Sequence, residues 1–238
     1  MSTVRGYRKC FTLIELLAVI AVGILMTALA VPAFRSLMRA NQVADCAATA
    51  KSVLERARVR AVNERCCIAV ILPNGAVSDA LKQYRLSGSR LAYVEKNVSG
   101  DYTFSKWLDP AWQKFPTGAL LSRVDDAVFV PQDGDITGCT PNLSAALTGA
   151  ADCFSRISGI KDDDGSASLD AGEHCALIYT AQGSVVGSGK CYLLFSEARL
   201  ADGETIVYPT AVTPGSGRSA NNIVLKLNKL TGIVEYDK

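Results

Sequence analysis

The side chains that could do chemistry in this chain are one carboxylate inside an apolar run, eight cysteines and a single histidine. Glu15 lies near the start of the run, residues 11–34, and no charged residue follows it before Arg35. A carboxylate within a bilayer costs roughly 2.5–3.5 kcal/mol and usually marks a function. Pairing with a cation makes such a charge tolerable, whereas a position among the lipid headgroups would leave Glu15 an ordinary surface residue.

No familiar catalytic motif accompanies these residues. The sequence lacks GxSxG, a Walker loop and HExxH, and His174 is the only histidine. Zinc ligation is disfavoured because there is no CxxC pair. The acidic stretch 161–173 suggests calcium, but an EF-hand frame around Gly165 would put Ile160 and Ala171 at ligand positions. A solvated acidic loop is the favoured interpretation, so we expect no enzymatic activity, no cofactor and no metal.

The cysteine content is typical of an exported protein, because disulfides persist outside the cytosol. Cys66 and Cys67 are adjacent and would point to opposite faces of a strand. If Cys10 leaves with a leader, seven cysteines remain, so at least one is a thiol or pairs between molecules. The expected pairs are Cys139–Cys153, which bracket a loop, and second Cys175–Cys191, which flank a predicted hairpin.

The apolar run must be helical if it enters lipid, because a helix satisfies its own backbone groups. Its uncharged part, 16–34, is about long enough to cross ~30 Å of hydrocarbon. Basic residues within 1–10 predict a cytoplasmic N-terminus and a single-pass orientation. A signal peptide usually has an apolar region of about 7–15 residues followed by an A-x-A-like cut, which this chain lacks.

The remaining chain predicts an α+β fold, with the long N-terminal helix packed on an antiparallel β-sheet domain. Residues 35–65 continue the helix in amphipathic form, with its basic residues on a solvated face, and 66–238 form an exported β-rich domain with a loop insertion at about 131–173. The apolar helix positions are Leu37, Ala40, Val43, Ala44, Ala47, Ala50, Leu54, Ala57 and Ala61. The predicted strands are 66–72, 83–86, 91–94, 102–107, 127–130, 175–180, 184–186, 191–196, 222–227 and 233–236, with a short helix at 143–151.

The segment KCFTLIELL, residues 9–17, resembles the cleavage and methylation motif of type IV pilins and type II secretion pseudopilins. The resemblance implies the pilin fold and a cut by prepilin peptidase between Cys10 and Phe11, followed by methylation of the Phe11 amine. It also implies that Glu15 pairs with the Phe11 amine of a neighbouring subunit, with Thr12 and Pro32 as further assembly residues. Cys10 departs from the pattern, because the family normally has glycine before the cut.

Two segments resemble the corresponding parts of the GspH/FimT class of minor pseudopilins. They are the helix segment ARVRAVNER, residues 57–65, and the final predicted hairpin with Thr231-Gly232. This implies a filament subunit of a type II secretion system or related pilus-like machine. It would be held in the bacterial inner membrane with a periplasmic domain, and its partners would be other pilins, prepilin peptidase and the assembly platform.

Two alternatives are a major pilus subunit and a DNA-binding minor pilin for natural transformation. The DNA-binding branch carries Gly-Arg-x-Arg near the C-terminus, where this chain reads LTGIVE, residues 230–235. Arg218 is the nearest substitute, and phosphate binding requires several charges. With a formal net charge of +2, nucleic acid is not an expected partner.

Overall fold

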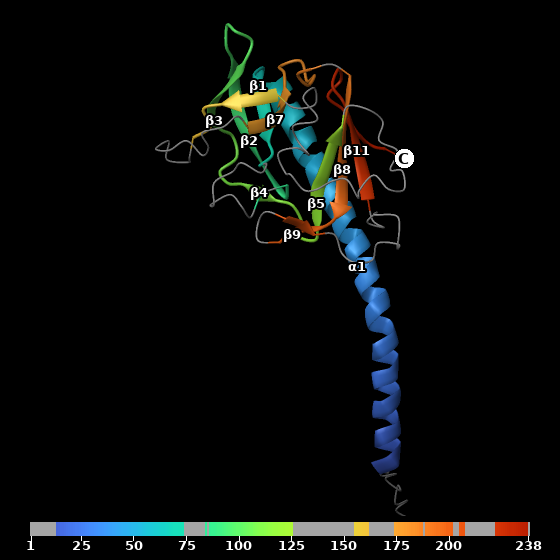
Figure 1. Ribbon diagram of the computed structural model, residues 1–238. Coiled ribbons are helices and arrows are strands. Elements are labelled where there is room, and N and C mark those ends of the chain that lie inside the picture. The colour runs from blue at the N-terminus through green and yellow to red at the C-terminus, as the bar shows by residue number, and fades with distance from the viewer. Residues whose placement is uncertain are drawn as a thin grey trace, which may run out of the picture. The chain divides into compact units, whose positions relative to one another are not determined.

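The computed structural model describes residues 13–73, 84, 86–125, 155–161, 174–187, 189–201, 205–207 and 222–237. The chain divides into two compact units, Met1–Arg39 and Ala40–Lys238, which are treated separately below. Figure 1 shows the chain and labels most of its elements.

One helix, α1 (Leu13–Glu64), contains both predicted helical segments, and it does not end at Pro32. Its C-terminus is a Schellman motif, in which the N–H of Cys66 donates to the carbonyl of Ala61 at 3.2 Å. Arg65 occupies the left-handed position of this motif, with φ of 53°. Glycine usually holds that position because it lacks a Cβ, so Arg65 adopts a strained conformation.

The second half of α1 buries one apolar face, as its period predicts. The buried positions are Val43, Cys46, Ala47, Ala50, Val53, Leu54, Ala57 and Ala61. The prediction was wrong for Ala44, which is exposed, and it missed Cys46 and Val53. The prediction of a solvated polar face is confirmed by ion pairs one turn apart, at 3.8 Å for Lys51–Glu55 and 3.5 Å for Arg60–Glu64.

Five strands of the second unit close into a ring, which we call the strand ring. Each strand pairs with the next in the order β1, β7, β6, β3, β2, and β2 pairs back to β1. The pairing of β3 with β6 is parallel, whereas the other ring pairs are antiparallel. The strands are β1 (Cys67–Ile71), β2 (Gly88–Lys96), β3 (Tyr102–Trp107), β6 (Ser155–Ser158) and β7 (His174–Tyr179), with the short β4 (Gln113–Lys114) on β2.

The strand ring has its own core, because one face of every ring strand contributes to a single buried cluster. Alanines from three strands, Ala69, Ala92 and Ala176, lie among larger side chains such as Ile157 and Ile178. A ring of so few strands leaves little interior space, which explains the small residues there. The opposite face of β1 and β7 joins the core around α1.

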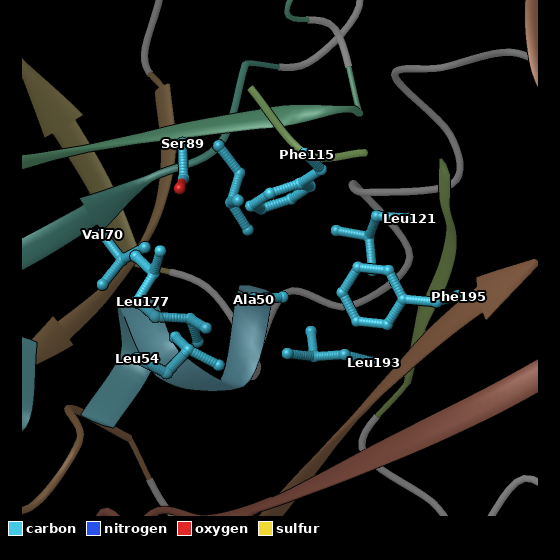
Figure 2. A pocket seen from close by; sticks show the side chains of 11 residues that line it. Ala50, Leu54, Val70, Ser89, Phe115, Leu121, Leu177, Leu193 and Phe195 are labelled. Carbon is cyan, nitrogen blue, oxygen red and sulfur yellow. The ribbon is translucent and has the colours of Figure 1, made fainter. Parts of the chain in front are cut away.

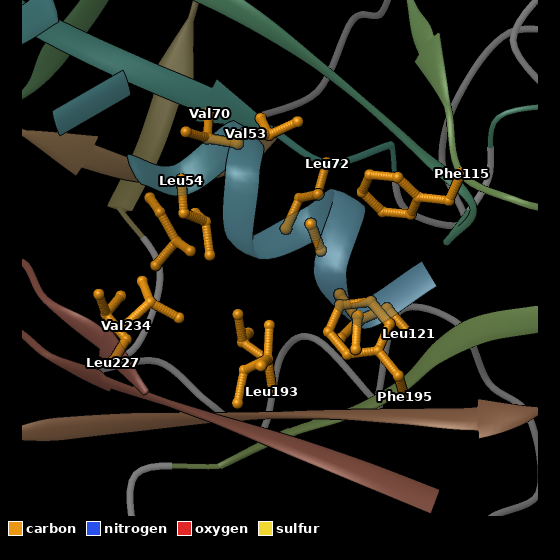
Figure 3. Packing of buried hydrophobic residues seen from close by; sticks show 14 of the residues in the cluster. Val53, Leu54, Val70, Leu72, Phe115, Leu121, Leu193, Phe195, Leu227 and Val234 are labelled. Carbon is orange, nitrogen blue, oxygen red and sulfur yellow. The ribbon is translucent and has the colours of Figure 1, made fainter. Parts of the chain in front are cut away.

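A second, antiparallel sheet packs on α1, and we call it the C-terminal sheet. Its order is β12 (Val234–Tyr236), β11 (Asn222–Asn228), β8 (Lys190–Glu197) and β5 (Ala119–Asp125). A separate two-stranded sheet pairs β9 (Arg199–Ala201) with β10 (Thr205–Val207). Figure 3 shows Leu193 and Leu227 of the C-terminal sheet and Val70 of the strand ring around Leu54 of α1. We call this shared cluster the helix-facing core.

Several sequence predictions differ from the structure. The predicted strand 83–86 is not a strand in its described part, since Tyr84 lies in a 3₁₀ turn and Leu86 in a turn. The segment 184–186 makes only a single bridge, between Tyr179 and Val185. β5 was not predicted from the sequence, which placed a strand at 127–130 instead. Residues 127–130 lie outside the described residues. The insertion supplies β6, which closes the strand ring. The rest of the insertion, including the predicted helix 143–151, lies largely outside the described residues.

Candidate assembly surface

The first half of α1 exposes its large apolar side chains. Burying one such side chain away from water stabilises the buried state by about 1.5–3 kcal/mol. A row of exposed apolar side chains therefore indicates a surface that is covered by a partner or by lipid. Between 42 and 82% of each is exposed; they are Leu13, Ile14, Leu16, Leu17, Val19, Ile20, Val22, Ile24, Leu25, Met26 and Val31. In the described part of the chain, no helical stretch was found with both the length and the hydropathy of a membrane span.

The one polar side chain within 16–34 is satisfied inside the helix. The hydroxyl of Thr27 donates to the carbonyl oxygen of Gly23, one turn earlier. This local bond removes the need for water or a partner at that position. The first half of α1 therefore presents an almost wholly apolar surface in the region that the sequence singles out.

Glu15 lies in the first turn of α1. The partial positive charge of a helix N-terminus favours a carboxylate there. Cys10, Phe11 and Thr12 lie outside the described residues, as does the side chain of Pro32. Cleavage before Phe11, methylation of its amine and pairing of that amine with Glu15 therefore stay predictions.

Three of the described thiols, those of Cys46, Cys66 and Cys67, are poor nucleophiles because burial raises their pKa values. Burial raises the pKa of Cys46 to about 12, and its Sγ lies 4.0 Å from the carbonyl oxygen of Ala119. Burial also raises the pKa of Cys66 and of Cys67. The prediction that these two point apart is confirmed, since Cys66 packs on the helix-facing core and Cys67 on the ring core. None of the three has the low pKa that a catalytic thiol needs.

The predicted disulfides, and the acid cluster for which calcium was weighed, fall mainly outside the described residues. Cys139 and Cys153 cannot be placed, and neither can the acid cluster at 162–164. Cys175 and Cys191 do flank a tight hairpin, in which Tyr179 bridges Val185 and the N–H of Thr180 donates to the carbonyl of Ser184 at 2.8 Å, although β7 belongs to the strand ring and β8, which carries Cys191, to the C-terminal sheet. Both disulfides stay predictions. Within the described ranges, no three His, Cys, Asp or Glu side chains gather as a metal site would require.

Three basic residues of the second half of α1, Lys51, Arg56 and Arg60, form ion pairs within the domain. Arg56 forms an ion pair with Asp109 at 2.9 Å and also donates to Gln113 at 3.2 Å. These contacts tie the segment before β4 to the helix. Because Arg56 is already paired, it offers little to a nucleic-acid phosphate, and Arg218 lies outside the described residues.

Sequence reasoning missed two sets of polar residues in the domain. Arg90 is 3% exposed, stacks on Trp107 with its guanidinium carbon 4.1 Å from the ring centre, and donates to the carbonyl of Pro110 at 2.8 Å. Lys229, Tyr179 and Arg58 form a second set of buried donors. The signal available for Lys229 was the alternation of the buried Leu225 and Leu227 in β11, which Lys229 continues one residue after the strand ends, since residues two apart share a face.

No family model matches the chain, and no curated protein matches it. A crystal structure of the type IV minor pilin FimU from Pseudomonas aeruginosa aligns with 83% of this chain and 90% of that chain, at 15% identity and a TM-score of 0.36. A likeness this distant does not by itself establish a shared fold.

Proposed function

We propose that this chain is a pilin-like structural subunit that enters a filament through the first half of α1. The observation that carries the proposal is the row of exposed apolar side chains from Leu13 to Met26 on a helix whose second half is the centre of a folded domain. An apolar helix surface of this kind gains free energy when other helices or lipid cover it. The domain needs no such cover, because it has two cores of its own.

Glu15 gives this assembly its register. Apolar packing is non-directional and does not by itself fix how far one helix slides along another. Attraction between the Glu15 carboxylate of one subunit and the Phe11 amine of the next fixes the axial position of the two helices. This attraction is stronger in a medium of low dielectric constant. The residue before the cut, Cys10, leaves with the basic leader, which frees that amine.

The finer assignment rests on the sequence motif. The subunit is a minor pseudopilin of the GspH/FimT class, stored in the inner membrane by residues 11–34 with its domain in the periplasm. Its partners are prepilin peptidase, the assembly platform and the other subunits of a type II secretion or related filament. The role is structural, with no cofactor and no catalysis.

Mass spectrometry of the mature protein tests the processing step directly. Co-expression with prepilin peptidase should yield a chain that begins with methylated Phe11, and a Phe11→Ala control should still be cut, because the cut precedes that side chain. A Cys10→Gly variant should be processed at least as completely as the natural chain. A chain that keeps residues 1–10 in the presence of the active peptidase would contradict the proposal.

A further inference from the structure

Of the four buried side-chain donors that have no partner among the described residues, three lie near the turn between β11 and β12. They are Nζ of Lys229, the hydroxyl of Tyr179 and Nε of Arg58. Both Lys229 and Tyr179 are 0% exposed. An unpaired buried polar group costs about 1–3 kcal/mol, and a charged one costs more, so this set calls for an acceptor.

The backbone brings these three residues to one end of the helix-facing core. The N–H of Val185 donates to the carbonyl of Lys229 at 2.7 Å, and Val185 is bridged to Tyr179. On the helix side, a Cβ added at Gly232 would lie 3.1 Å from Cδ of Arg58. The turn after β7, the turn between β11 and β12, and α1 therefore meet around Arg58.

The hydrogen-bonding chemistry of the set is that of donors. Lysine and the Nε of arginine can only donate. Burial raises the pKa of Tyr179, so its hydroxyl keeps its proton, although the nearby Arg58 opposes that rise. The other groups that act on Tyr179 are the buried Cys191 and the carboxylate of Glu55, which is half exposed and lies 3.8 Å from Lys51. Positive donors without an acceptor suit an anion and repel a metal cation.

We propose that Lys229, Tyr179 and Arg58 bind one small inorganic anion, either a halide or an oxyanion. The anion neutralises the buried ammonium group and supplies acceptors to all three donors. The three donors come from α1, from β7 and from the turn between β11 and β12. Binding of the anion therefore holds the hairpin of β11 and β12 against the helix. This site is independent of filament assembly.

Unfolding of the full chain in a neutral detergent tests the site. Unfolding by urea would be followed by tryptophan emission. The buffer would contain gluconate, replaced stepwise by chloride or by phosphate at constant ionic strength. An anion that binds only the folded state lowers the unfolded-to-folded ratio about tenfold for each tenfold rise in its concentration above Kd. Lys229→Met removes the charge and should abolish this response. Lys226→Met, which lies within β11 on the face opposite the buried Leu225 and Leu227, should retain it.

Tyr179→Phe keeps the ring and removes one donor, so it should weaken anion binding even if Lys229→Met fails to fold. Anomalous scattering from a crystal soaked in bromide should place an ion within hydrogen-bonding distance of the three side chains. The chloride and phosphate titrations distinguish a halide site from an oxyanion site. A natural chain that responds to neither anion beyond ionic strength, or a Tyr179→Phe chain that responds as strongly as the natural one, would overturn the proposal.

Discussion

Replacing Gly232 with alanine should destabilise the domain more than any surface glycine substitution. Gly232 has φ of 67° in the turn between β11 and β12, and a Cβ there would lie 1.9 Å from the carbonyl oxygen of Gly183. The left-handed conformation costs an alanine about 1–2 kcal/mol. Relief of the clash requires the turn to move away from Gly183 and Arg58.

That movement puts two hydrogen bonds at risk. The N–H of Gly232 donates to the carbonyl of Asn228, and the N–H of Val185 donates to that of Lys229, both at 2.7 Å. At about 1 kcal/mol each, their loss brings the total to roughly 3–4 kcal/mol. This is a large share of the about 5–15 kcal/mol that stabilises an ordinary domain.

Gly159→Ala is the matched control, because Gly159 has φ of 74° but no atom within 4 Å of its added Cβ. It should cost only the conformational term, about 1–2 kcal/mol. The assay is urea unfolding of both full-length variants in detergent, read by the emission of the two tryptophans, Trp107 and Trp112, which both lie in the domain. Equal losses of stability in the two variants would refute the contact between the turns.

Three further changes test the domain. Ser89→Ala should raise the free energy of unfolding by about 1 kcal/mol. The buried Ser89 hydroxyl has no partner among the described residues and borders an apolar cavity of about 10 Å³ (Figure 2). A loss of stability in urea unfolding would contradict this prediction. Arg65→Gly should gain about 0.5–1 kcal/mol by relieving the left-handed residue after α1, whereas Arg65→Ala should gain nothing in the same titration. The folded-state pKa of Cys46, about 12, is above its unfolded value of 9.0, so stability is full below pH 9 and falls as pH rises from 9 towards 12. A Cys46→Ala chain should lose less stability over that pH range, and an identical slope would count against burial of the thiol.

Regular local patterns made much of the fold predictable. The 3.6-residue period fixed the buried face of α1 at Ala47, Leu54 and Ala61, and β3 begins and ends where the sequence predicts, at Tyr102 and Trp107. These elements follow from propensity and burial within a short window. The lone Glu15 in an apolar run likewise needs no tertiary information to be noticed.

Features that depend on distant pairing could not be predicted. The parallel contact of Tyr102 with Ile157 joins β3 to a strand of the insertion, and nothing local in either segment specifies a parallel neighbour. For the same reason Cys175 and Cys191, although near in sequence, belong to different sheets. The donor set at Lys229 exists only because two turns meet α1, so sequence spacing did not reveal it.

The most direct measurement of the central claim is the amount of Glu15→Ala chain that enters filaments in cells expressing the complete assembly machinery. Breaking a buried ion pair costs about 3–5 kcal/mol, so incorporation should fall at least about a hundredfold, while the amount of protein in the membrane stays unchanged. Glu55→Ala, which removes a half-exposed carboxylate from the same helix, should assemble as the natural chain does. Normal incorporation of Glu15→Ala into sheared filaments would contradict assembly through this acid.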